Sequence, residues 1–266
     1  MTTPASPDWD PQQYGKFSDE RSQPFRDLLG LVELADIATA VDLGCGSGEL
    51  TALAAEQLHI RDLLGLDNSP AMLSAAAVHA SPTVRFASGD LAAWAGPAVD
   101  LVVANASLQW VPNHRDVLAR WVASLRPGGQ IAVQVPANAG QPTHTVAVEV
   151  AGRAHFADAF GPAGPPRDPV AENVFAPEVY ARILNELGCV RQHVRLQVYP
   201  HVLTNSRAVV EWVRGTTLTR FQKVLDADTF DAFLAEYEAR LIEVIGEHTP
   251  YFFPFRRILM WGRIDG

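Results

Sequence analysis

The stretch VDLGCGSGEL, residues 41–50, decides the fold class of this chain. An apolar run gives way there to Gly44, Gly46 and Gly48, spaced two residues apart. Glycine adopts backbone conformations that other residues avoid, and without a side chain it lets a ligand approach the main chain closely. The pattern therefore predicts a strand that turns sharply beneath a ligand.

Two phosphate-binding loops do not fit this stretch. A dinucleotide fingerprint requires Gly-x-Gly-x-x-Gly, because its third glycine lets a helix pack closely on the strand, and Glu49 occupies that position. A Walker A loop requires Gly-Lys-Ser/Thr, which does not follow here. What remains is a loop of bare backbone that contacts a ligand without a dedicated phosphate cradle.

Short apolar runs alternate with segments of helical period on either side of this loop. Such alternation is typical of a parallel sheet covered by helices. The expected strands are residues 40–44, 62–67, 84–90, 99–105 and 130–135.

Two helices have well-marked boundaries. Ser69 and Pro70 are expected to be the N-cap and the first residue of a helix that follows Asp67 directly. Asn113 is expected to cap a second helix, which the sequence RPGG at 126–129 ends. The apolar face of that helix would consist of Val117, Leu118, Trp121, Val122 and Leu125.

The second half of the chain has a different pattern. Residues 190–198 alternate as a strand with one solvated side, whose other face would be Val190, Val194, Leu196 and Val198. Residues 204–247 are helical in pattern, and 257–264 predict a buried final strand. The segment 160–169 is a Pro/Gly-rich loop.

We therefore expect a single domain with helical additions. Its parts would be an N-terminal helical cap (1–36), a cofactor-binding core (37–136), helices with the Pro/Gly-rich loop (137–189), a strand (190–203), a helical lid insertion (204–250) and a final strand (251–266).

The composition excludes several classes of function. A net charge of -9 over 266 residues disfavours nucleic acid as a partner, since such binding depends on neutralising phosphates with Lys and Arg. No apolar run is long enough to span a bilayer, and the first twenty residues do not resemble a signal peptide. Only Cys45 and Cys189 are present, and CxxC and HExxH are absent. We expect a soluble, reduced, cytoplasmic protein without a structural metal or a membrane partner, either monomeric or weakly self-associating.

Two acidic residues narrow the ligand. Asp67 ends the second expected strand, where its carboxylate can accept hydrogen bonds from both hydroxyls of a ribose. Asp90 ends the third expected strand and can accept from an adenine amino group. The ligand would be adenosine-like and would bind at the carboxyl ends of the strands, as is usual for open parallel sheets.

At this point the sequence resembles the class I S-adenosylmethionine-dependent methyltransferases. The motifs VDLGCGSG, GLDNSPAML, SGD and LRPGG occur in that family's order and spacing over residues 38–136. The resemblance implies a Rossmann-like α/β fold: a seven-stranded, mostly parallel sheet with helices on both faces and the last strand antiparallel. It also implies S-adenosyl-L-methionine as the cofactor, with S-adenosyl-L-homocysteine as its product.

Each of these residues also has a purely structural interpretation. The glycines could form only a tight turn, and Asp67 could merely cap the helix at Ser69. Asp90 could close a strand, and Met72 could belong to the core rather than pack near adenine.

Arginines indicate the chemistry of the acceptor. The Asn/Asp-Pro-Pro-Tyr/Phe signature of many amide and amine methyltransferases does not follow the fourth expected strand, so a nitrogen acceptor is less favoured. Arginine binds carboxylates through a planar bidentate fork, and several arginines at one pocket would select a small polyanion. Each of them could instead be a solvated surface charge. The candidates are Arg21, Arg214, Arg220, Arg256 and Arg257.

A closer resemblance covers almost the whole chain. WDPQQYGKFSDERSQPF, NASLQWVPNH, EWVRGTTL and FPFRRILM are similar to segments of the bacterial trans-aconitate 2-methyltransferases, which convert one carboxylate of a planar tricarboxylate to its methyl ester. The resemblance implies cofactor contacts from Asp42, Gly44, Gly46, Gly48, Asp67, Ser69, Met72, Asp90, Leu91 and Asn105. On the acceptor side it implies Tyr14, Gln109 and His114 near the reacting groups, with Arg21, Trp110, Arg214 and Arg257 binding the substrate. Two departures are Ser47, where the family often has Pro, and a longer loop at 160–169, which affects the expected rim of the pocket.

The implied reaction requires no general base. A carboxylic acid has a pKa of about 4, so the nucleophile is already ionised at neutral pH. His114 would then orient groups or balance charge, and the arginines would hold the carboxylates that do not react. Three alternatives remain: a methyltransferase of the same fold acting on a phenol or other uncharged metabolite, a nicotinamide oxidoreductase, which Glu49 disfavours, and a non-catalytic S-adenosylmethionine-binding protein.

Overall fold

The computed structural model of the protein describes residues 18–33 and 37–266, with side chains described from Ser22 onward. The chain divides into two compact units. Unit 1 contains the described residues up to Pro136, together with Asn173–Gln197 and Arg257–Gly266. Unit 2 contains Ala137–Glu172 and Val198–Arg256.

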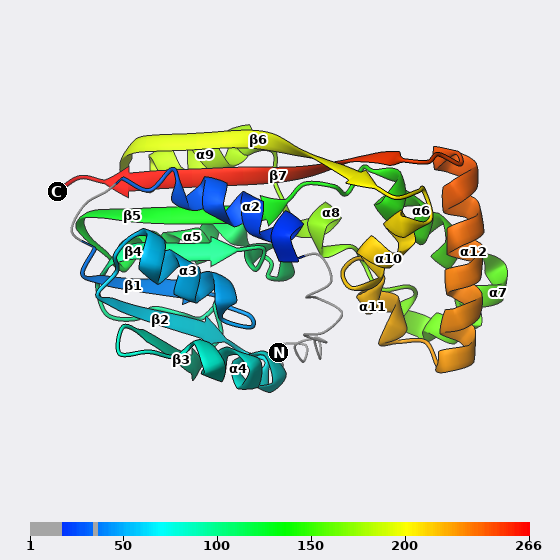
Figure 1. Ribbon diagram of the computed structural model, residues 1–266, viewed down its shortest axis with the longest axis horizontal. Helices are drawn as coiled ribbons and strands as arrows, with labels where there is room; N and C mark the ends of the chain where they lie inside the picture. Colours follow the sequence, from blue (N-terminus) through cyan, green and yellow to red (C-terminus); the bar gives the residue numbers. More distant parts are fainter. Residues whose placement is uncertain (1–17, 34–36) are drawn as a thin grey trace. The chain divides into compact units, whose positions relative to one another are not determined.

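A seven-stranded sheet with the order β3-β2-β1-β4-β5-β7-β6 organises unit 1 (Figure 1). Strands β1 to β4 pair in parallel, β5 is parallel to β4, and β7 is antiparallel to β5. The expected fold class is therefore confirmed. The strands are β1 (Thr39–Leu43), β2 (Asp62–Asp67), β3 (Val84–Ser88), β4 (Val99–Asn105), β5 (Leu125–Pro136), β6 (Cys189–Leu203) and β7 (Tyr251–Ile264).

The central strands are buried on both faces, as expected of a parallel sheet covered by helices. Strand β4 is apolar along almost its whole length, and Leu101 to Ala104 are inaccessible to solvent. In Figure 1, α2 and α3 lie in front of the sheet and α9 lies behind it. The helices of this unit are α2 (Ser18–Leu29), α3 (Glu49–Gln57), α4 (Pro70–Ala76), α5 (His114–Ala123) and α9 (Pro177–Glu186), with short 3-10 turns η1 (Ala77–His79) and η2 (Leu108–Trp110).

The start of α4 is as predicted, and the limits of α5 are partly different. Ser69 caps α4 by accepting a hydrogen bond from the Met72 backbone, and Pro70 is its first residue. Asn113 precedes α5 in a left-handed conformation, and its side chain makes no capping bond. The helix ends at Ala123 rather than at the RPGG sequence, because Leu125 already pairs with Val99 as the beginning of β5.

The prediction of a buried valine face on β6 is wrong. Val190 is 62% exposed and Val198 is 46% exposed on β6, the edge strand of the sheet, so this face is in contact with solvent. On the opposite face, Arg191 forms an ion pair with Glu33 at 2.6 Å and lies over the Trp261 ring. The charged face is therefore the one with protein contacts.

Unit 2 is mainly helical. Its longest helix, α12, packs along α6, and the Tyr237 hydroxyl donates to the Thr143 carbonyl at 3.0 Å. Part of the predicted loop at 160–169 is ordered as η3, which is interrupted at Gly161. The elements are α6 (Pro142–Ala151), α7 (Ala154–Ala157), η3 (Asp158–Ala163), α8 (Pro169–Asn173, whose last residue belongs to unit 1), α10 (Ala208–Arg214), α11 (Thr219–Gln222) and α12 (Ala227–Ile245).

Among the described residues, no helix combines the length and the apolar composition that crossing a bilayer requires. The same residues include no group of three or more His, Cys, Asp or Glu side chains arranged to hold a metal ion. Cys45 and Cys189 are both buried free thiols.

Candidate functional site

The glycine loop follows β1 and has an unusual backbone. Gly44, Gly46 and Gly48 have φ angles of 85°, 56° and 81°, in the left-handed region that L-residues rarely adopt. The Gly44 and Cys45 amides both donate to the Leu66 carbonyl, at 2.8 and 3.0 Å, which ties the loop to β2. The sharp turn predicted from the sequence is thus built from three left-handed glycines at every second position of the loop.

The three glycines differ in what surrounds them. A Cβ added to Gly44 would lie 2.3 Å from the Ser107 Cβ, and one added to Gly48 would lie 2.8 Å from the Ala76 Cβ. Both positions therefore require glycine for packing within the protein. At Gly46 an added Cβ would meet no atom of residues 18–33 and 37–266 within 4 Å. Gly46 is the position of the loop where open space adjoins bare backbone.

Asp67 connects this loop to the next helix. Its Oδ2 accepts from the Gly46 amide at 3.0 Å, and its Oδ1 accepts from the Ser69 amide at 2.8 Å. The carboxylate thus contributes to the start of α4 and also lies beside the open glycine. Each oxygen retains a lone pair, so two further hydroxyl donors can be accommodated.

The loop lies at the switch point of the sheet, where the strand order reverses between β1 and β4. Here the Ser107 hydroxyl donates to the Leu43 carbonyl at 2.6 Å and joins the ends of these two strands. Among the residues that the structure describes, two buried acceptors nearby in the chain have no hydrogen-bond partner, namely Asn105 Oδ1 and Gln109 Oε1. Because unpaired buried acceptors are costly, they suit a ligand with N–H donors, such as the ammonium group of a methionine moiety.

Asp42, another predicted cofactor contact, is almost completely buried. It is 3% exposed and accepts a hydrogen bond from the Thr51 hydroxyl at 2.6 Å. Burial raises its pKa to about 6, partly offset by the Thr51 hydrogen bond, and the nearby Asp67 charge raises it further. The side chain fixes α3 to β1 behind the loop.

The titration of Asp42 predicts a pH-dependent stability. The folded protein binds this proton more tightly than the unfolded chain, so the stability contributed by Asp42 is lost as the pH rises from about 4 to about 6. The change in pKa corresponds to about 3 kcal/mol. Urea unfolding of the parent and Asp42→Asn between pH 4 and 8 should give free-energy curves that diverge by about this amount, the variant being favoured at high pH. Glu56→Gln, an exposed change on α3, is the control. Parallel curves for the parent and Asp42→Asn would contradict the assignment.

The remaining cofactor candidates surround the same edge of the sheet. Asp90 follows β3, is exposed, and accepts from the Ala92 amide at 2.8 Å. Leu91 Cδ2 lies 3.4 Å from the position that a Cβ on Gly44 would occupy. Met72 is 4% exposed on the first turn of α4.

His114 is completely buried, and protein groups occupy both of its ring nitrogens. Nε2 lies 2.9 Å from the Leu108 carbonyl, to which it must donate, so Nδ1 accepts from the Tyr180 hydroxyl at 2.7 Å. Burial lowers its pKa, although hydrogen bonds to the Leu108 and Val111 carbonyls counteract this effect. His114 therefore has no N–H available for a ligand. It connects η2 to α9, and we assign it no role in the reaction.

The acceptor-side candidates are distributed over both units. Gln109 is buried and its amide nitrogen donates to the Ala106 carbonyl at 2.7 Å, whereas Trp110 is 36% exposed. Arg257 is 8% exposed in unit 1, where its backbone pairs with Pro136 at the carboxyl end of β5. Arg214 belongs to unit 2, is 40% exposed and lies 3.7 Å from Glu211. Tyr14 and the Arg21 side chain lie outside the described residues.

Ser107 is the residue that sequence reasoning missed. It fills the space beside Gly44 and bridges β1 and β4, so it shapes the floor of the site. Its only signal in the sequence is a position two residues after the end of an apolar strand, which many loop serines share.

These observations fit a sulfonium nucleoside. The open backbone at Gly46, the carboxylate at the end of β2 and the unpaired acceptors after β4 all follow carboxyl ends of parallel strands, where ligands of such sheets bind.

Comparison with known proteins supplies the family. Residues 40–129 match the model of a methyltransferase domain. The chain is 41% identical to a trans-aconitate 2-methyltransferase of Streptomyces avermitilis, with 96% of each chain covered. It is 42% identical to one of Methylobacterium nodulans (96% of this chain and 98% of that protein) and 39% identical to one of Deinococcus radiodurans (94% and 96%).

Solved structures agree with the fold. The YcgJ protein of Bacillus subtilis has a TM-score of 0.59 at 15% identity, covering 92% of this chain and 99% of its own. A phosphoethanolamine N-methyltransferase 2 of Haemonchus contortus, solved with S-adenosylhomocysteine, has a TM-score of 0.55 at 15% identity and covers 95% of this chain and 53% of its own. At these identities the likeness concerns the fold alone.

Proposed function

Because the chain belongs to the trans-aconitate 2-methyltransferase family, we propose that it methylates one carboxylate of trans-aconitate to give the monomethyl ester. It is an S-adenosyl-L-methionine-dependent methyltransferase, so the methyl donor is S-adenosyl-L-methionine and the second product is S-adenosyl-L-homocysteine. The observation that carries the proposal in the structure is the open, left-handed Gly46 beside Asp67 at the switch point of the sheet.

Different residues around this loop would contact different parts of the cofactor. Asp67 would accept from the ribose hydroxyls, since its two oxygens have lone pairs left beyond the backbone amides. Asn105 and Gln109 would accept from the ammonium group, which satisfies their unpaired oxygens. Asp90 and Met72 would lie by the adenine, and Leu91 would contact the loop beside Gly44.

The reaction needs alignment and dehydration more than acid–base catalysis. The cofactor, when held by the glycine loop and Asp67, would supply an electrophilic methyl group for a carboxylate oxygen and would leave as a neutral thioether that keeps the electron pair of the broken C–S bond. The carboxylate is ionised at neutral pH, because the pKa of a carboxyl group is about 4. Well-oriented reactants gain up to roughly 7 to 11 kcal/mol relative to free ones, so protein groups that fix the acid can provide most of the acceleration.

Arginines would provide that orientation by holding the carboxylates that do not react. Arg257 is well placed for this role, because its backbone lies at the carboxyl end of β5, the edge at which the glycine loop lies. An arginine on the attacking oxygen would stabilise the ground state and slow the reaction. Trp110 would help to exclude water.

Transfer of labelled methyl to a panel of di- and tricarboxylates, followed by identification of the product, tests the proposal. We expect trans-aconitate to be the preferred acceptor and its monomethyl ester to be the product. Transfer only to phenolic or other uncharged metabolites would favour the alternative acceptor class. Tight binding of S-adenosylmethionine without transfer to any acid would favour a non-catalytic role.

The setting of the reaction follows from the same properties. We place the enzyme in the cytoplasm, where its two buried free thiols would stay reduced. A net charge of -9 makes a small anion that is held by specific arginines a better partner than nucleic acid or an anionic membrane. The chain would work as a monomer or a weak homo-oligomer.

A further inference from the structure

A buried chain of polar side chains lies within unit 2 and includes Arg220, one of the candidate arginines from the sequence. Asp168, just before α8, is 5% exposed and accepts from His144 Nδ1 at 2.6 Å. Its same oxygen, Oδ2, lies 3.1 Å from Nη1 of Arg220, whose side chain is 9% exposed. The Thr217 hydroxyl lies 3.3 Å from His144 Nε2 and extends the chain.

Asp168 is held in place by a further contact. Its other oxygen, Oδ1, accepts from the Val170 amide at 2.9 Å, which fixes the carboxylate at the start of α8. Burial acts to raise the pKa of Asp168, but the hydrogen bond and charge of His144 and the charge of Arg220 outweigh it and keep the pKa well below its usual range. The residue is therefore an ionised, immobile support for Arg220.

One edge of the Arg220 guanidinium group is buried and makes no hydrogen bond to the described residues. Nε and Nη2 are both buried without a hydrogen-bond partner in the part of the chain that the structure describes. These two nitrogens are adjacent on one side of the planar guanidinium, and their N–H bonds point the same way. That edge is the fork that takes a carboxylate through two parallel hydrogen bonds.

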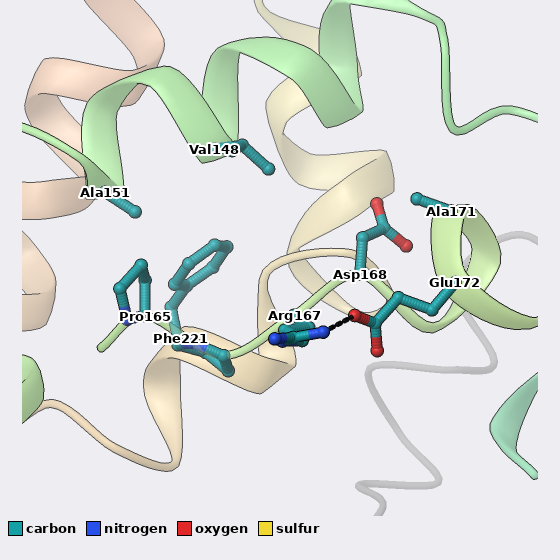
Figure 2. Close-up of a pocket in the computed structure, with 9 residues that line it drawn as sticks. Val148, Ala151, Pro165, Arg167, Asp168, Ala171, Glu172 and Phe221 are labelled. Carbon is teal, nitrogen blue, oxygen red and sulfur yellow. Dashed lines mark hydrogen bonds and ion pairs between the residues drawn. The ribbon is translucent and has the colours of Figure 1, made fainter. Parts of the chain in front are cut away.

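A cavity adjoins this cluster (Figure 2). It has a volume of about 310 Å³, which lies at the lower end of the range for small-molecule sites. Asp168 and Phe221 both line it, and both also contact Arg220: Asp168 through the ion pair, Phe221 through its ring, whose centroid lies 4.7 Å from the guanidinium carbon. Figure 2 shows Arg167 paired with Glu172 at the same cavity, so the charge of Arg167 is already balanced.

We propose that Arg220 binds a carboxylate of the small polycarboxylic acid, with Asp168 and His144 as positioning residues that orient its free edge. The ligand is a spectator carboxylate of the small polycarboxylic acid, so the inference rests on the proposed function. Several other arginines of unit 2 differ from Arg220, because carboxylates at the surface balance their charges. Such pairs are Arg153 with Glu236, Arg207 with Glu238 and Arg240 with Glu149.

Binding measurements on ligands that each lack one carboxylate test this assignment. Itaconate, mesaconate and (Z)-glutaconate are trans-aconitate with one of its three carboxylates removed in turn. Calorimetric titrations of these four acids, with S-adenosylhomocysteine saturating, are carried out on the parent, Arg220→Gln and Arg220→Lys. Arg207→Gln is the matched control, since it removes an exposed, paired arginine of the same unit.

We expect Arg220→Gln to weaken the binding of trans-aconitate at least about 30-fold. Two of the dicarboxylates should lose affinity similarly, and the third, which lacks the carboxylate that Arg220 holds, should change by less than about twofold. Arg220→Lys should also lose affinity, because an ammonium group cannot form the fork. Arg207→Gln should behave as the parent.

Two outcomes would overturn the inference: equal losses for all four acids, which indicate a general structural effect, or no loss for trans-aconitate. The lysine variant keeps the charge beside Asp168, so it decides the question if the glutamine variant does not fold. If the proposed function itself is wrong, the parent protein will neither bind nor methylate any of these acids. This result differs from both outcomes that would overturn only the role of Arg220.

Discussion

Replacing Asp67 with alanine is expected to lower the affinity for S-adenosylhomocysteine at least about 100-fold. In the proposed site the variant would lose the acceptors for the ribose hydroxyls, and hydrogen bonds to a charged group are worth about 1.5 to 3 kcal/mol each. It also loses the bonds from the Gly46 and Ser69 amides, so the loop and the start of α4 are no longer fixed against each other. Equilibrium titration with the product cofactor measures the effect directly, without turnover.

Asp62→Ala is the matched control, because Asp62 lies at the opposite end of the same strand. It pairs with Arg85 at 2.7 Å on an exposed surface, and such pairs contribute at most about 1 kcal/mol. Its loss should leave cofactor affinity unchanged. If Asp67→Ala and the parent bound S-adenosylhomocysteine equally well, the ribose assignment would be wrong, and Asp67 would serve only the backbone amides.

Replacing Arg257 with alanine is expected to raise the KM for trans-aconitate about 100-fold with little change in cofactor affinity. Removal of one partner from a buried, hydrogen-bonded charge pair costs roughly 2 to 5 kcal/mol, and the bound acid would lose such a pair. In the proposed arrangement Arg257 would hold a carboxylate that does not react, so the loss should appear mainly in substrate binding. Steady-state kinetics with saturating cofactor, together with a titration of S-adenosylhomocysteine, separates the two quantities.

The adjacent residue provides the control for this experiment. Arg256 is exposed, whereas Arg257 is 8% exposed, so Arg256→Ala removes an equal charge from the same strand without reaching the site. We expect its KM to match that of the parent. A parallel fall in cofactor and acceptor affinity in Arg257→Ala would show instead that the arginine supports the fold of β7, and it would be removed from the acceptor site.

The sequence predicted the cofactor half of the fold well, because local rules determine it. Gly44 to Gly48 and Asp67 lie where strand ends, turn chemistry and helix capping agree with one another. When these local features all indicate the same structure, the sequence alone is enough to predict it. The sequence could not predict which of the three glycines are closely packed, since the neighbours of Gly44 and Gly48 come from distant parts of the chain.

The polar residues of the acceptor side were less predictable for a related reason. His114 has the residue type of a catalytic base, but Tyr180 and Leu108 occupy both of its nitrogens. Arg220 was indistinguishable from the other arginines in the sequence, and only its contact with Asp168 separates it from them. Hydrogen-bond partners that are distant in the chain leave no periodic signal. For the same reason, alternation alone could not tell that the valines of β6 belong to an edge strand.

The division of the chain has a consequence for engineering the enzyme. The main chain passes between the two units at 136–137, 172–173, 197–198 and 256–257. The first crossing follows β5 directly, and the last two fall inside β6 and β7. A chimera that exchanges the helical unit with that of a relative therefore needs four junctions, and two of them must keep strand register across the graft. Transplanting single side chains such as Arg220 is the less disruptive route to a changed acceptor preference, since it leaves every one of those crossings intact.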